Sequence, residues 1–178
     1  IGVVVIRTLD DKSPRIHSSA FVSETAYVIG DVEIGAESSI WPGTVIRADA
    51  GSISIGINTC IQDNSVVHGD SDVIIGNNVV IGHKVLCHAK LVGDKSLIGN
   101  GATVNDGALI GKGSLIASGA MVIENMEIPP GSMVVGIPAR VRGTVQNRHT
   151  DLIRMTVEEY VRKSRLYKTQ GNLESENL

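Results

Sequence analysis

Three of the five histidines, His68, His83 and His88, lie close together in the sequence. Three neutral imidazoles form a ligand set that proteins use for catalytic metal ions, because they leave a fourth coordination position open for water. The bound ion lowers the pKa of that water, so hydroxide forms near neutral pH. The sequence therefore predicts a metal centre that activates water, provided that the surrounding elements bring the three side chains together.

Those elements follow from an internal repeat, in which an aliphatic residue recurs every six positions, with small slips, and is often followed by glycine. A period of six matches neither a helix face nor a meander with turns every ~8–12 residues, and it is typical of short strands wound into a β-helix. The repeated residues are Ile16, Val22, Val28, Ile34, Ile40, Ile46, Ile55, Ile61, Val67, Ile75, Ile81, Cys87, Val92, Ile98, Val104, Ile110, Ile116, Val122, Ile128 and Val134.

Three strands per coil make a triangle of about eighteen residues, and the series supplies about seven coils. The residue two before each aliphatic one is mostly small and points inward with it, because strand side chains alternate. We therefore expect an all-β solenoid, a parallel β-helix over residues 13–142, after a lead-in strand over residues 1–12. The small inward residues are Ala20, Ala26, Ser38, Thr44, Thr59, Ser65, Ala102, Ala108, Ser114 and Ala120.

Apolar residues at helical spacing follow the repeat and predict a C-terminal α-helix within residues 143–170, lying along the β-helix. Thr150 or Asp151 is the expected N-cap, and residues 171–178 are expected to form a frayed tail. Tyr160 and Tyr167 fall on this helix, where packing is their expected role. The apolar positions are Leu152, Ile153, Met155, Val157, Tyr160, Val161 and Leu166.

The repeat also decides where the histidines point. When the faces are counted along the chain, three inward residues fall on one face in successive coils. The residue after each of them points outward, because strand side chains alternate. The inward residues are Ile46, Val67 and Cys87, and the outward ones are Arg47, His68 and His88. Because neighbouring coils lie at the strand spacing of about 4.8 Å, the two histidines can reach one metal ion.

His83 lies at the corner that leads into this face. It is five extended residues from His88, a span of up to ~16 Å, which is too far for a ligand bond of about 2 Å to the same ion. We therefore expect the third ligand to come from a neighbouring copy of the chain. A ring closed by a threefold axis would hold three equivalent sites, so the metal site predicts a homotrimer.

Composition narrows the remaining function classes. The net charge of −3 gives no basic surplus, so neither nucleic acid nor an anionic membrane is an expected partner. The apolar run near the N-terminus is too short to span a bilayer. Two cysteines make no disulfide framework, and no signal-peptide pattern precedes them, so we expect a reducing, cytoplasmic location.

Four motifs set in hexapeptide repeats over about residues 12–142 are found together: Arg47-x-Asp49, Ile61-Gln62-Asp63-x-x-Val66-x-His68, Ile81-Gly82-His83-x4-His88 and Gly136-x-Pro138-Ala139-Arg140. In this combination the chain resembles the γ-class carbonic anhydrase family. The histidine spacing is the most specific part, whereas the last motif is shared with hexapeptide acyltransferases. The resemblance implies a left-handed β-helix, a homotrimer, and a metal ion at each subunit interface.

By resemblance the ion is Zn2+, with Fe2+ or Co2+ as alternatives, held by His68 and His88 of one chain and His83 of the next. The implied enzyme is a lyase, in which zinc-bound hydroxide reversibly hydrates CO2 to bicarbonate. Gln62 would orient the metal-bound water or the substrate by hydrogen bonding. Asp63 and Asp49 would pair with Arg47 and hold the interface together; for Arg47 and Asp49 a purely structural interfacial ion pair is the alternative.

Departures from the family pattern leave the metal ligands intact and argue against fast catalysis. The acidic loop after the first metal histidine is only Gly69-Asp70-Ser71-Asp72, so no glutamate is available there as a proton shuttle. Asp70 or Asp72 could shuttle protons, or could be solvated loop carboxylates. Cys60 stands where the family usually has Asn, and its redox sensitivity is open.

Three other functions remain as alternatives. The first is an acyltransferase of the hexapeptide-repeat class, which would need a catalytic histidine on a protruding loop, and no such long loop is evident. The second is a metal-dependent thioesterase, since metal-activated water can also attack a thioester. The third is a non-catalytic trimeric assembly protein that keeps its metal for stability. Metal-dependent trimerisation without hydration of CO2 would favour the third.

Overall fold

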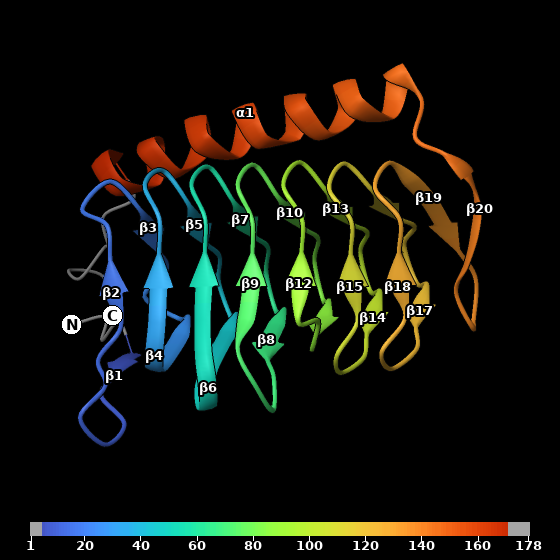
Figure 1. The fold of residues 1–178 in the computed structure, drawn as a ribbon. Coiled ribbons are helices and arrows are strands. Elements are labelled where there is room, and N and C mark those ends of the chain that lie inside the picture. The colour runs from blue at the N-terminus through green and yellow to red at the C-terminus, as the bar shows by residue number, and fades with distance from the viewer. Residues whose placement is uncertain (1–4, 171–178) are drawn as a thin grey trace.

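The computed structural model describes residues 5–170, which form a left-handed parallel β-helix with one α-helix packed along it (Figure 1). The tail expected at residues 171–178 lies outside this range. One sheet of twelve strands forms two faces, A and B, because β4 and β6 each run around the corner between them. A second sheet of eight strands forms face C. The solenoid expected from the six-residue period is thereby confirmed.

The strands of each face stack in successive coils, as the spacing predicts. Face A holds β1 (Val5–Arg7), the first halves of β4 (Tyr27–Ile34) and β6 (Val45–Ile55), β8 (Val66–His68), β11 (Leu86–Cys87), β14 (Thr103–Val104) and β17 (Met121–Val122). Face B holds β2 (Arg15–Ile16), the second halves of β4 and β6, β9 (Val73–Ile75), β12 (Leu91–Val92), β15 (Leu109–Ile110) and β18 (Glu127–Ile128). Face C holds β3 (Phe21–Val22), β5 (Ser39–Ile40), β7 (Cys60–Ile61), β10 (Val80–Ile81), β13 (Leu97–Ile98), β16 (Leu115–Ile116), β19 (Ser132–Val135) and β20 (Arg140–Thr144).

The core is the column of inward residues. On face A, Ile46 pairs with Val67 and Val67 with Cys87, and all three side chains are fully buried. The ten small inward residues expected from the sequence are also buried. Large aliphatic side chains and small ones therefore share a narrow triangular interior, which explains how a chain with few aromatic residues fills a core.

Glycine follows many inward residues because the coils approach closely at the corners. A Cβ atom on Gly99 would lie 2.5 Å from the backbone nitrogen of Ser118 in the next coil. The corners also need left-handed backbone, which Asn78 adopts with a φ of 56°. Asparagine tolerates this conformation better than most residues. The aliphatic–glycine repeat is thus a requirement of coil stacking.

Helix α1 (Asn147–Gln170) runs along face C from the last coil back to the first (Figure 1). Its 24 residues give a length of about 36 Å, close to the ~34 Å spanned by seven coils. Ile153 and Val157 pack on Cys60 and Val80, and the ring of Tyr160 lies 5.2 Å from that of Trp41. The expected packing role of Tyr160 is confirmed, as is the helix itself.

The expected N-cap of the helix was wrong. The helix begins at Asn147, and the carbonyl of Gln146 accepts from the backbone N–H groups of His149 and Thr150. The N–H of Gln146 donates in return to Nδ1 of His149 at 3.1 Å, so a histidine takes the part that Glu or Gln has in a capping box. Neither Gln nor His is a strong capping signal, so the sequence pointed to Thr150 and Asp151 instead.

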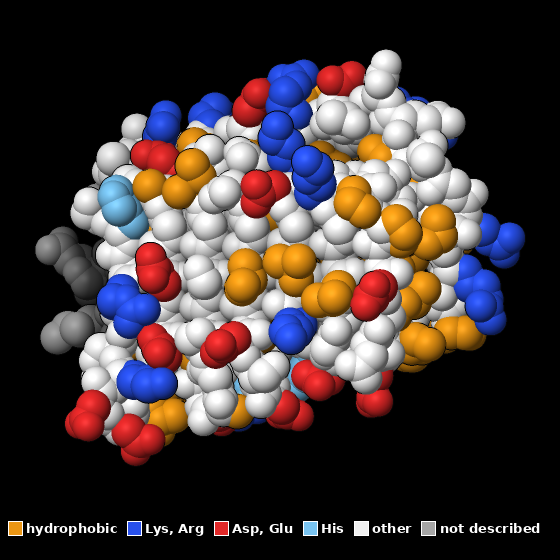
Figure 2. Space-filling model, in the orientation of Figure 1, with side chains coloured by type: hydrophobic (Ala, Val, Ile, Leu, Met, Phe, Trp, Pro, Cys, Tyr) orange, Lys and Arg blue, Asp and Glu red, His pale blue; other side chains and the backbone are white. Residues whose placement is uncertain are grey.

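The solenoid ends in a strand that the repeat does not predict. β20 turns back and pairs antiparallel with β19, placing Arg140 and Arg142 on the outermost strand of the face C sheet. Charged residues on an edge strand discourage pairing with other chains. In the orientation of Figure 1, hydrophobic side chains gather toward this end, while charges of both signs are interspersed elsewhere (Figure 2). Within residues 5–170, no helix is long and apolar enough to cross a membrane.

Candidate metal centre

The two histidines on face A meet as the face count predicts. Arg47 pairs in register with His68, and His88 follows in the next coil. The Nδ1 atom of His68 lies 2.9 Å from Nε2 of His88, and the ring centroids are 4.7 Å apart. His68 is buried, with 7% of its surface exposed. One chain therefore brings two imidazole nitrogens together on one wall.

Asp49 lies behind His68, at the ring nitrogen that faces away from His88. Its Oδ1 atom lies 2.8 Å from Nε2 of His68, and its other oxygen pairs with Arg47. The hydrogen bond from His68, together with Arg47, holds the pKa of the Asp49 carboxyl below its ordinary value. An ionised carboxylate accepts the proton of Nε2–H, so the neutral ring of His68 carries a lone pair on Nδ1, which faces His88.

This donor pair fits a metal ion. Zinc binds imidazole nitrogens at about 2.0–2.1 Å, so two nitrogens on one tetrahedral ion lie ~3.3 Å apart. The observed separation of 2.9 Å is within a few tenths of an ångström of that value. A carboxylate behind a ligating histidine is also the usual support for a metal ligand. His68 and His88, with Asp49 behind them, could thus supply two ligands of a three-imidazole site.

His83 forms a separate group at the corner between faces C and A. Its Nδ1 atom lies 2.9 Å from Oδ2 of Asp63, and its backbone N–H donates to Oδ1 of Asn100 at 3.0 Å. The side chain is 44% exposed. Among residues 5–170 no group of three or more His, Cys, Asp or Glu side chains of one chain is placed to hold a metal, so His83 does not join the other two within one chain.

Asp63 and Gln62 lie away from the face A wall. Within one chain Asp63 pairs with His83 and Arg47 pairs with Asp49, so an Asp63–Arg47 contact across a subunit boundary stays a prediction. Gln62 is buried beside Cys60, with its amide nitrogen 3.9 Å from the sulfur. A role for Gln62 toward the metal likewise stays a prediction.

Cys60 lies under α1 and is closed to solvent. Burial raises the pKa of its thiol to about 12, so the reactive thiolate is scarce at neutral pH. Burial likewise raises the pKa of Cys87 to about 11. Both thiols are structural core residues in the folded chain.

Two features near the site escaped the sequence reasoning. The Oδ1 atom of Asp106 lies 4.0 Å from Nδ1 of His88. The face count could have found this residue, because it directly follows Asn105, the outward residue that lies beside His88 in the next coil of face A. A cavity of about 220 Å3 also opens beside Asp49, lined by residues 9–12 and 48–51. The six-residue repeat does not predict that residues 9–12 lie next to residues 48–51, because the first segment precedes the repeat.

In the acidic loop, Asp72 is hydrogen-bonded to the neighbouring coil. The Oδ1 atom of Asp72 accepts hydrogen bonds from the N–H and the hydroxyl of Ser52 at 2.8 and 2.9 Å. These bonds, the backbone one first, lower the pKa of Asp72. Asp72 therefore fastens its loop to the neighbouring coil, while Asp70 is exposed.

The sequence matches known proteins in part. No protein-family model matches it. "Gamma carbonic anhydrase 1, mitochondrial" of Arabidopsis thaliana is 55% identical over 58 residues, which cover 33% of this chain and 21% of the relative. "Carbonic anhydrase" of Geobacillus kaustophilus is 49% identical over 57 residues, which cover 32% of this chain and 31% of the relative. The matched segments thus span less than a third of these relatives.

The solved structures extend the likeness to nearly the whole chain. A hexapeptide transferase family protein from Anaplasma phagocytophilum superposes with a TM-score of 0.89 and 35% identity, covering 92% of this chain and 98% of that one. Both kinds of relative agree with the six-residue repeat and the coil geometry. The chain therefore belongs to the hexapeptide-repeat family of left-handed β-helix proteins, the family of the γ-class carbonic anhydrases.

Proposed function

We propose that this chain is a metal-dependent, carbonic anhydrase-like enzyme that interconverts CO2 and bicarbonate. The observation that carries the proposal is the 2.9 Å approach of His68 Nδ1 to His88 Nε2, with Asp49 fixing the proton on the far side of His68. The proposed third ligand is His83 of the partner subunit. The partial matches to two carbonic anhydrases support the same assignment.

The two groups of residues would act alike on their imidazoles. The carboxylate of Asp63 lies 2.9 Å from Nδ1 of His83 and would hold a proton there, which would leave the Nε2 lone pair free, as Asp49 leaves the Nδ1 lone pair of His68 free. Both carboxylates would also raise the basicity of the ligand they support. A zinc ion held by the three nitrogens would supply Lewis acidity that activates water near neutral pH.

A homotrimer is part of the proposal, because one chain holds only two of the three ligands. Exposed apolar side chains on face A support an interface there: Leu86 is 41% exposed, Met121 38% and Ile123 50%. Covering these side chains with a partner subunit would bury them beside the histidines. The buried thiols Cys60 and Cys87 fit a reducing compartment such as the cytoplasm.

The test combines metal analysis with stopped-flow measurement of CO2 hydration on protein purified without oxygen. We expect one metal ion for each chain and a trimer in solution. We also expect the rate of CO2 hydration to fall when the metal is removed and to recover when zinc is added. We expect the rate to be modest, because Asp72 is tied to Ser52 and no glutamate stands in its loop. A metal-loaded trimer with no hydration above buffer would favour the assembly role or thioester hydrolysis.

A second candidate is acyl transfer, because the similar solved structure is described as a member of the hexapeptide transferase family. This candidate needs a base near a thioester but no metal. Transfer of acetyl groups from acetyl-CoA by the metal-free protein would support it, whereas metal-dependent release of CoA without an acceptor would point to a thioesterase.

A further inference from the structure

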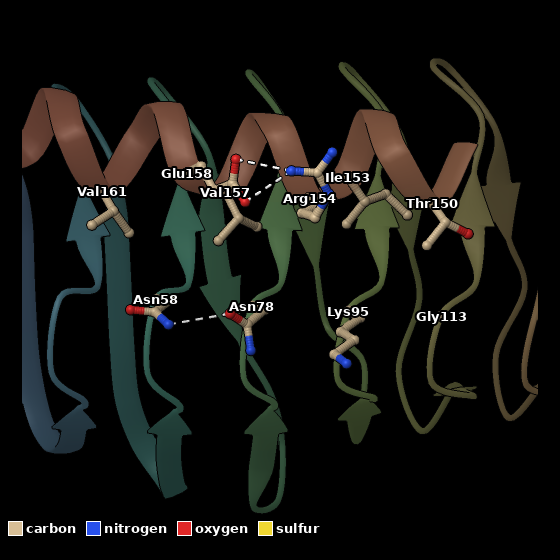
Figure 3. Close-up of a pocket in the computed structure, with 10 residues that line it drawn as sticks. All are labelled: Asn58, Asn78, Lys95, Gly113, Thr150, Ile153, Arg154, Val157, Glu158 and Val161. Atoms are coloured by element: carbon tan, nitrogen blue, oxygen red, sulfur yellow. Dashed lines mark hydrogen bonds and ion pairs between the residues drawn. The ribbon is translucent and has the colours of Figure 1, made fainter. Parts of the chain in front are cut away.

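A cavity of about 480 Å3 lies between α1 and the corner that joins faces B and C (Figure 3). It lies on the far side of face C from the corner that carries His83, so it is separate from the proposed metal centre. Its size is in the range of small-molecule sites, ~300–1,000 Å3. Four successive coils supply its floor, and helix residues supply its roof.

The roof is apolar. Ile153 and Val157 are 3% and 6% exposed, and Val161 continues the same row one turn further along α1. Figure 3 shows these side chains directed from the helix toward the coils. An apolar wall of this length suits an unbranched hydrocarbon chain, because the row follows the helix axis.

The floor is polar and includes one positively charged side chain, that of Lys95. Asn58 donates from Nδ2 to Oδ1 of Asn78 at 3.2 Å. Lys95 occupies the same corner position in the next coil, and its ammonium group has no acceptor atom that could receive a similar hydrogen bond from Asn78. Asn78 and Lys95 thus lie on successive coils at the floor of the cavity, and each carries a nitrogen donor (Figure 3).

The charge balance leaves Lys95 without a counterion. Arg154 and Glu158, the other charged residues of the lining, pair with each other at 3.0 and 3.1 Å. Asp94 directs its Oδ1 atom to the N–H of Asn77 at 2.7 Å. In the part of the chain that the structure describes, no ion pair involves Lys95. The lining thus carries a net charge of about +1.

We propose that this cavity binds a monoanionic straight-chain carboxylate, with the chain under Ile153, Val157 and Val161 and the carboxylate at Lys95 and Asn78. One negative charge matches Lys95, which has no ion pair among residues 5–170, and the row of Ile153, Val157 and Val161 matches the chain. The probe for the test is decanoate, whose chain of about ten carbons suits a cavity of this size.

The experiment titrates the full chain with decanoate by calorimetry and follows the methyl groups of Ile153, Val157 and Val161 by NMR. Saturable binding with shifts confined to these methyl groups supports the proposal. Lys95→Asn removes the charge and keeps a residue that suits the left-handed backbone, since Lys95 has a φ of 58° and Asn78 one of 56°. The matched control is Lys84→Asn, which makes the same change at a corner with a φ of 56° outside the cavity.

We expect Lys95→Asn to weaken decanoate binding roughly threefold to fivefold, because the ammonium group is partly solvated, and Lys84→Asn to leave it unchanged. We also expect decanol, which has the same chain and no charge, to bind more weakly than decanoate. Absence of saturable binding, equal affinity for decanol, equal effects of the two lysine variants, or shifts spread over other methyl groups would overturn the proposal.

Discussion

The carboxylate of Asp63 lies 2.9 Å from Nδ1 of His83, at a corner of the coil. On the face A wall, Asp49 lies behind His68 and is hydrogen-bonded to its Nε2 atom at 2.8 Å. The hydrogen bond with Asp49 holds a proton on Nε2 of a neutral His68 ring and leaves Nδ1 free to bind, and Asp63 is close enough to Nδ1 of His83 to favour the same arrangement there. In the proposed metal site, one chain would supply two ligands from face A and one from the corner, and a second copy would be needed to bring them together.

The first prediction tests the shared site with two ligand variants. We expect His83→Ala and His68→Ala each to lose the metal, because three imidazoles are needed to hold the ion in the proposed site. Co-expressed, the two variants can combine an intact corner of one chain with an intact wall of the other. If both variants form trimers, about a quarter of the interfaces should then regain metal.

Elemental analysis of the mixed trimers provides the readout, and His17→Ala, which changes a histidine outside both groups, serves as the control. His17 contacts Ser19 and is expected to leave metal content unchanged. Stoichiometric metal in His83→Ala alone, or no recovery in mixed trimers, would exclude a shared site.

The second prediction concerns Asp49. Replacement by Asn keeps the size of the side chain but removes the charge that supports His68. We expect the metal affinity to fall by about 10- to 100-fold, the usual cost of losing a group behind a metal ligand. Competition with a chelator measures this change. Asp70→Asn, at an exposed loop position, is the matched control, and an equal loss in both variants would show that Asp49 has no such role.

The fold was readable from the sequence because one physical period sets the whole architecture. A slip of one residue would turn each inward side chain outward, so the aliphatic column of Ile46, Val67 and Cys87 fixes the register of three coils at once. The positions of His68 and His88 follow from that column without any knowledge of side-chain contacts.

Other features could not be predicted from the sequence, because they depend on individual side-chain contacts that do not recur with the six-residue repeat. The pairing of Asp63 with His83 joins two coils through a corner, where a difference of one rotamer changes the partner. The helix start at Asn147 rests on Gln146 and His149, which seldom serve as a cap. The cavity under α1 lies where the side chains of the helix do not fill the space above the coil corners, and this depends on the three-dimensional packing alone.

The third prediction is a pH dependence of stability at Asp72. Its pKa is lowered in the folded chain by hydrogen bonds from Ser52, so the folded state favours the ionised form. Asp72→Ala should therefore reduce the free energy of unfolding near neutral pH. The difference from the unchanged protein should begin to shrink as the pH falls below the unfolded pKa of about 3.9, and vanish below the folded value. Urea unfolding at a series of pH values, with Asp70→Ala for comparison, measures it; a difference that grows in acid would contradict the assignment.

The fourth prediction tests coil stacking with a matched pair of glycines. A Cβ atom on Gly99 would lie 2.5 Å from the nitrogen of Ser118, which is backbone and cannot rotate away. A Cβ atom on Gly119 would meet nothing within 4 Å, although its φ of 69° is strained for alanine. We expect Gly119→Ala to cost about 1 kcal/mol of unfolding free energy, the usual cost of left-handed backbone. Gly99→Ala should cost several times more, because two coils must separate and the buried hydrogen bonds between them lengthen. Thermal unfolding followed by circular dichroism ranks the two, and equal costs would show that the close approach of the coils does not require glycine after the inward residue.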